Sequence, residues 1–129
     1  MKLRKVLITG SRDWYNYDAI ENVVKDELDE SLKDCSVLLV IHGDNRRGAD
    51  MAAEIICRKL GVHSARIAAL WEFEGHSAGP VRNAIMVALE PAVVHAFPLP
   101  ESKGTRVTMR FAKEAGIPVI EHSSKESAA

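Results

Sequence analysis

Glycines beside hydrogen-bond donors or cations recur in four segments of the sequence. They read Gly10-Ser11-Arg12, His42-Gly43 with Arg47-Gly48-Ala49-Asp50, Gly79-Pro80-Val81-Arg82-Asn83, and Lys103-Gly104-Thr105. Glycine allows a backbone to approach a ligand closely, and guanidinium and backbone N–H groups bind phosphate oxygens. One such segment is common at the start of a helix. Four in one chain favour a site for a phosphate-bearing ligand.

The stretch 71–83 contains the most informative cation. We expect it to be a loop followed by a helix, with Gly79 as the N-cap, Pro80 as the first helical residue, and Arg82 and Asn83 in the first turn. A guanidinium at the positive end of a helix is unfavourable unless an anion also binds there. We therefore favour a phosphate-binding Arg82 over a solvated one, and we expect Arg82→Ala to leave the fold intact.

Other residues near these segments have two interpretations each. Trp14 and Trp71 either stack on a base or ribose or simply pack their loops, and Asp50 either stabilises a helix start or binds a ribose hydroxyl. His42 ends an apolar run beside the expected crevice, where it is a candidate ligand contact, and Lys103 either reaches phosphate or faces solvent. The complete predicted ligand-binding set is Gly10, Ser11, Arg12, Asp13, Trp14, His42, Gly43, Arg47, Gly48, Asp50, Trp71, Gly79, Arg82, Asn83, Lys103, Gly104 and Thr105.

Apolar runs alternate with amphipathic segments along the whole chain. We predict strands at 3–9, 37–41, 64–70, 92–97 and 117–120, and helices between them, the first opening on a capping box of Asp18 and Glu21. This alternation is typical of an α/β protein with a Rossmann-like, doubly wound, parallel five-stranded sheet. We expect one domain over 1–122, with a frayed tail over 123–129. In such a fold all four glycine-containing segments lie at the carboxyl edge of the sheet.

Composition and charge narrow the function further. The chain has 129 residues, so one domain is expected. Its net charge is −1 and it has no basic run, which argues against nucleic acid as a partner. The two cysteines and five histidines have no metal-ligand spacing, and no apolar run is long enough for a signal peptide or membrane span. We therefore expect a cytoplasmic protein with no metal and no cofactor. The segment 85–89 is apolar around most of a helix, which favours a homo-oligomer.

The same segments resemble a known family. Gly-Ser-Arg-Asp-Trp at 10–14, Arg-Gly-Ala-Asp at 47–50, Ala-Gly-Pro-Val-Arg-Asn at 78–83 and Gly-Thr at 104–105 are similar to the YspA-like branch of the SLOG superfamily. That superfamily includes the LOG phosphoribohydrolases and the DNA-processing protein DprA. The resemblance implies a Rossmann-like fold and a nucleotide or ADP-ribose-like ligand, without implying an established reaction.

The sequence also departs from the enzymes of that superfamily. LOG enzymes carry Pro-Gly-Gly-x-Gly-Thr-x-x-Glu where this chain has Pro98 to Thr108, so the paired glycines are missing and Thr108 stands at the position of the glutamate. The loop 43–48 lacks the second glycine of the usual form. We therefore expect a nucleotide-binding module, with a sensor role as one form of it. The alternatives are LOG-like N-glycosidic cleavage, with Asp44, Asp50, Glu72 or Glu101 as a substitute carboxylate, and DprA-like nucleic-acid binding.

Overall fold

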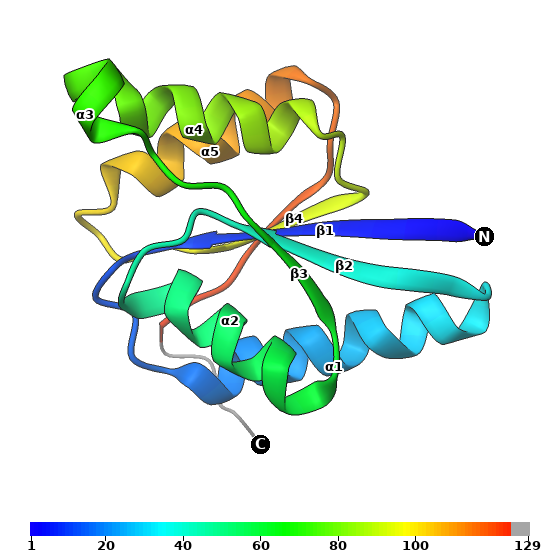
Figure 1. The fold of residues 1–129 in the computed structure, drawn as a ribbon. Coiled ribbons are helices and arrows are strands. Elements are labelled where there is room, and N and C mark those ends of the chain that lie inside the picture. The colour runs from blue at the N-terminus through cyan, green and yellow to red at the C-terminus, as the bar shows by residue number, and fades with distance from the viewer. Residues whose placement is uncertain (125–129) are drawn as a thin grey trace.

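The computed structural model describes residues 1–124 as one parallel sheet covered by helices on both faces (Figure 1). Its strands are β1 (Lys2–Gly10), β2 (Ser36–His42), β3 (His63–Arg66), β4 (Val93–Phe97) and β5 (Val119–Glu121). Its helices are α1 (Tyr17–Lys33), α2 (Gly48–Leu60), α3 (Trp71–Glu74), the 3₁₀ turn η1 (Gly75–Ser77), α4 (Ala78–Ala88) and α5 (Lys103–Glu114). Helices α1 and α2 cover one face of the sheet, while α3, α4 and α5 lie on the other (Figure 1).

The strand order is β3-β2-β1-β4-β5, and every pairing is parallel. The chain therefore moves outward from β1 to β3 and then crosses back to β4. This reversal of direction between β1 and β4 leaves a crevice at their carboxyl ends, because the connections that follow them diverge to opposite faces. The predicted fold class and the five parallel strands are both confirmed.

The middle of β1 explains why the sheet holds two separate cores. Val6, Leu7 and Ile8 are fully buried. Val6 and Ile8 pack into the core with residues of α1 and α2, whereas Leu7 packs with Met86 and Ala112 of α4 and α5. Successive residues of a strand face opposite sides, so a run of apolar residues is what a strand buried on both faces requires.

Two helix starts differ from the predictions. The N-cap of α1 is Asn16, whose side chain accepts a hydrogen bond from the backbone N–H of Ala19, so the predicted capping box at Asp18 is wrong. Helix α4 begins at Ala78, with Ser77 at the N-cap position, so Gly79 is not the cap. The segment predicted as a loop before it is largely helical, formed by α3 and η1. Strand β3 ends at Arg66, four residues before the predicted end.

The carboxyl end of the described chain packs against the sheet. The His122 ring stacks on Phe97 with centroids 4.5 Å apart, and its Nε2 lies 3.0 Å from Nδ1 of His95. The frayed tail that the sequence predicts falls mainly on residues 125–129, which lie outside the described residues. Within residues 1–124, no helix has the length and apolar composition needed to cross a membrane.

Candidate ligand-binding cleft

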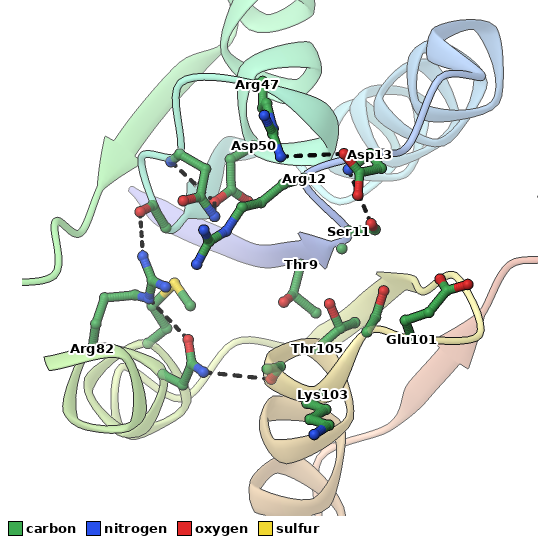
Figure 2. Close-up of a pocket in the computed structure, with 17 residues that line it drawn as sticks. Thr9, Ser11, Arg12, Asp13, Arg47, Asp50, Arg82, Glu101, Lys103 and Thr105 are labelled. Atoms are coloured by element: carbon green, nitrogen blue, oxygen red, sulfur yellow. Dashed lines mark hydrogen bonds and ion pairs between the residues drawn. The ribbon is translucent and has the colours of Figure 1, made fainter. Parts of the chain in front are cut away.

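A cleft of about 350 Å³ opens at the carboxyl ends of β1, β2 and β4. Figure 2 shows Arg12, Arg47 and Asp50 on the α2 side of the cleft, Lys103 and Thr105 on the α5 side, and Thr9 between them. The lining residues are Thr9, Gly10, Ser11, Arg12, Asp13, Gly43, Asn45, Arg47, Asp50, Arg82, Asn83, Met86, Glu101, Ser102, Lys103, Gly104 and Thr105. Twelve of them belong to the predicted set. The fold therefore brings two of the four segments complete into one site, together with Gly43, Arg47 and Asp50 of the second and the Arg82-Asn83 end of the third.

The loop after β1 is fixed by its own backbone. Ser11 donates its N–H to the carbonyl oxygen of Phe97 at 3.0 Å, and its carbonyl accepts the N–H groups of Trp14 and Ala49. The Ser11 hydroxyl accepts the N–H of Asp13 at 3.0 Å. Arg12 is exposed and makes no hydrogen bond or salt bridge with any residue in the range 1–124. The loop is therefore rigid while its guanidinium remains available to a ligand.

Gly48 allows the second loop to lie directly against the first. Its φ is +73°, and a Cβ at this position would lie 2.3 Å from the carbonyl oxygen of Ser11 and 2.5 Å from Cα of Arg12. No side chain fits there without displacing backbone. The role of Gly48 is therefore to bring the two loops together, which explains why it does not itself line the cleft.

The start of α5 presents an unneutralised helix end. Its N-cap residue, Ser102, makes no side-chain capping bond, and its first turn contains no acidic residue. The hydroxyl of Ser102 instead accepts the N–H of Leu99 at 2.9 Å. The N–H groups of Lys103, Gly104 and Thr105 therefore retain their partial positive charge beside the cleft.

Arg82 is held inside a network instead of lying at a helix start. It belongs to the second turn of α4, its Nη1 donates to the carbonyl of Gly43, and its Nε donates to Oδ1 of Asn83 at 2.9 Å. Asn83 in turn donates to the carbonyl of Gly104 at 3.4 Å. The expectation that Arg82 and Asn83 occupy the first turn is therefore wrong. Because this network joins the loop after β2, α4 and the start of α5, we expect Arg82 to contribute to stability.

Arg82 also faces a second guanidinium. Burial lowers the pKa of Arg82, the carboxylate of Asp50 opposes that shift, and the nearby charge of Arg12 adds to it. Figure 2 shows Arg12 extending from its loop toward the Arg82 side of the cleft. Two guanidinium groups that repel each other across a cleft create a favourable position for an anion.

Asp50 is the one deeply buried carboxylate of the cleft among residues 1–124. It is 4% exposed, and its Oδ2 accepts the backbone N–H of Asn45 at 3.2 Å and the side-chain amide of Asn45 at 3.0 Å. Burial raises the pKa of the Asp50 carboxyl, while the Asn45 hydrogen bond and the charge of Arg82 oppose this rise. Within the described chain it forms no salt bridge.

His42 lies behind the cleft, in a separate polar cluster. Its Nδ1 accepts the N–H of Asp44 at 3.1 Å, so the proton is on Nε2, which donates to Oε1 of Glu54 at 2.8 Å. Burial alone would raise the pKa of Glu54, but hydrogen bonds from His42, Ser64 and Arg58 outweigh it and lower the pKa to about 2. Both ring nitrogens of His42 are thus engaged within the protein, and His42 does not line the cleft.

Both tryptophans lie away from the cleft. Trp14 is 2% exposed, packs edge-to-face on Phe97 at 5.2 Å, and donates its indole N–H to the carbonyl of Asn16 at 2.8 Å. Trp71 is 53% exposed and does not line the cleft, and its ring lies over Gly79, which is also outside the cleft. The structure therefore shows packing for Trp14 and places neither tryptophan in the lining of the cleft.

Five lining residues are absent from the predicted binding set. They are Thr9, Asn45, Met86, Glu101 and Ser102. Ser102 occupies an N-cap position, a signal that helix-start rules could have used. Met86 lies one turn beyond Arg82 and Asn83, so the helical period alone places it on their side of α4. No local sequence pattern identifies Asn45 as a site residue, because its role is to donate hydrogen bonds to the Asp50 carboxylate.

The sheet order and the crevice define this chain as an α/β protein of the Rossmann-like class. Residues 4–73 match the model of the YspA, cpYpsA-related SLOG family. The chain is also 40% identical over 128 residues to the Gene 61 protein of Mycobacterium phage D29, a match that covers 95% of this chain and 99% of that protein. The chain therefore belongs to the YspA, cpYpsA-related SLOG family, as the motifs predict. Membership is consistent with a nucleotide-related ligand.

Proposed function

We propose that this protein binds a nucleotide or nucleotide-derived ligand in the cleft, with the ligand phosphate at the start of α5. The observation that carries the proposal is the meeting of an uncapped, acid-free helix start with the unpaired guanidinium of Arg12. Backbone N–H groups and the helix dipole favour an anion there. Arg12 provides a planar fork for phosphate oxygens, and Lys103 adds a second positive charge.

The test is calorimetric titration with AMP, ADP-ribose and inorganic pyrophosphate, using the wild type and Arg12→Ala. A charge-assisted hydrogen bond contributes roughly 1.5–3 kcal/mol, so Arg12→Ala is expected to weaken binding about tenfold to a hundredfold. Its melting temperature should not change, since Arg12 is exposed and unpaired. Arg46→Ala is the matched control, because Arg46 is exposed in the neighbouring loop but does not line the cleft. Equal affinities of the Arg12→Ala and Arg46→Ala variants would contradict the phosphate role.

N-glycosidic cleavage is the second candidate, and the cleft does contain carboxylates. Asp50 and Glu101 line it, whereas Asp44 lines a neighbouring hollow and Glu72 is exposed on α3. Thr108 is fully buried and donates its hydroxyl to the carbonyl of Gly104 at 3.3 Å, so it takes no part in the cleft. Release of free base from AMP by the wild type, and not by Asp50→Asn or Glu101→Gln, would favour this reaction over binding alone.

We also propose that the protein forms a homo-oligomer through α4. Met86 and Val87 are buried against the sheet, but Ile85 is 46% exposed and Leu89 is 37% exposed. These side chains leave apolar surface that a second copy of the chain can cover. Sedimentation at micromolar concentration is expected to show a dimer or larger species, and Ile85→Asp should shift it to the monomer. A wild type that sediments as a monomer would contradict this.

A further inference from the structure

The two helices that begin at the cleft differ in charge. Helix α2 has Asp50 in its first turn, whereas the first turn of α5 has no acidic residue. A carboxylate in the first turn neutralises the positive end of its own helix. Asp50 therefore makes the start of α2 itself a poorer site for phosphate than the start of α5, although Arg12 and Arg47 lie on the same side of the cleft (Figure 2).

Asp50 is positioned as an acceptor. Its Oδ2 accepts hydrogen bonds from the backbone N–H and the side-chain amide of Asn45, which hold the carboxylate in place. The carboxylate lines the cleft, is 4% exposed, and has no salt-bridge partner in the described residues. A buried carboxylate without a paired cation is most stable when donors from a ligand satisfy it.

The two walls thus offer complementary chemistry to one ligand. Figure 2 shows Asp50 on the α2 side of the cleft, with Lys103 and Thr105 across from it on α5. A phosphate would be repelled by a carboxylate directly beside it, so the ligand group nearest Asp50 must donate hydrogen bonds and carry no negative charge. A hydroxyl of a sugar attached to that phosphate meets both conditions.

We infer that Asp50 is a specificity-determining residue that accepts a hydrogen bond from a ribose hydroxyl, so that the cleft discriminates against nucleotides that lack this hydroxyl. The inference rests on the proposed function, because it requires a nucleotide phosphate at α5. It specifies the sugar of the ligand as ribose and assigns recognition of that sugar to the α2 side of the cleft. Asn45 is a positioning residue in this arrangement, since it fixes Asp50 without itself defining the preference.

The experiment compares AMP, 2′-deoxy-AMP, 3′-deoxy-AMP and inorganic pyrophosphate by calorimetry, in the wild type and in Asp50→Asn. Loss of one hydrogen bond to a charged acceptor weakens binding roughly tenfold. The wild type should therefore bind AMP about tenfold more tightly than at least one of the deoxynucleotides. In Asp50→Asn that preference should disappear, while pyrophosphate binding should be unchanged or tighter, because a negative charge has been removed from the cleft.

Asp50→Asn retains an oxygen that can accept both hydrogen bonds from Asn45, so the loop 43–47 is expected to stay in place. The comparison of ligands in the wild type also does not depend on how this variant folds. Tight AMP binding with equal affinity for both deoxynucleotides would overturn the inference and leave the proposed function standing. Failure of the wild type to bind AMP, its deoxy analogues and pyrophosphate would overturn both.

Discussion

The substitution Gly48→Ala is expected to reduce the free energy of unfolding by about 2–5 kcal/mol. A positive φ costs an L-residue roughly 1–2 kcal/mol, and forcing extra volume into a packed position adds about 1–3 kcal/mol. At Gly48 both terms apply, because φ is +73° and the new Cβ would lie 2.3 Å from the carbonyl oxygen of Ser11. The atom that it meets is backbone, so no rotamer change relieves the contact.

Gly61→Ala provides the matched control for this substitution. Gly61 has almost the same φ, +70°, but a Cβ there meets no atom within 4 Å. Gly61→Ala should therefore lose only the conformational term of about 1–2 kcal/mol. Urea unfolding of both variants measures the difference directly. If the two substitutions destabilise equally, the close packing of the loops that carry Gly48 and Ser11 does not hold in solution.

Arg82→Ala is expected to lower both stability and ligand affinity. The variant leaves the carbonyl of Gly43 and Oδ1 of Asn83 without their donor, at a cost of about 1–3 kcal/mol, and it removes a positive charge that acts on Asp50. The loops after β2 and β4 then lose their connection through α4. We expect AMP affinity to fall at least as far as in Arg12→Ala. The substitution both displaces the walls of the cleft and removes a positive charge from them.

The contrast between the two arginines identifies the role of each. Arg12→Ala should reduce affinity without changing the urea midpoint, whereas Arg82→Ala should change both. Arg82→Lys keeps the positive charge but replaces the planar fork of the guanidinium, which donates through Nε and Nη1, with a single ammonium, so it is expected to regain only part of the lost stability. An Arg82→Ala variant with the unfolding midpoint of the wild type would show that the network contributes nothing.

The fold is predictable from this sequence because its signals are local. The fully apolar run of Val6, Leu7 and Ile8 indicates a strand buried on both faces, and strand–helix alternation then requires parallel pairing. The segment after β3 was harder to predict. No residue of α3 is buried, so its apolar Trp71 and Phe73 carry no periodic pattern that separates a short helix from a loop.

The candidate site is predictable only in part, because several of its residues depend on distant partners. Parallel topology places the loops with Arg12, Arg47 and Lys103 at one edge, as predicted. Arg82 has its partner 39 residues away at Gly43, a pairing that no local rule reveals. The position of Trp14 also depends on a distant residue. It stands in a polar segment of the sequence, yet its ring is buried against Phe97 of β4.

The most direct test of nucleotide binding in the cleft is an NMR titration of the wild type with AMP, following backbone amide resonances. If phosphate binds at the start of α5, the largest shifts should fall on the amides of Gly104 and Thr105, followed by those of Ser11 and Arg12. The amides of Gly61 and Gly116, which lie outside the cleft, should not move. Shifts confined to residues away from the cleft, or no shifts at millimolar AMP, would contradict the proposed function.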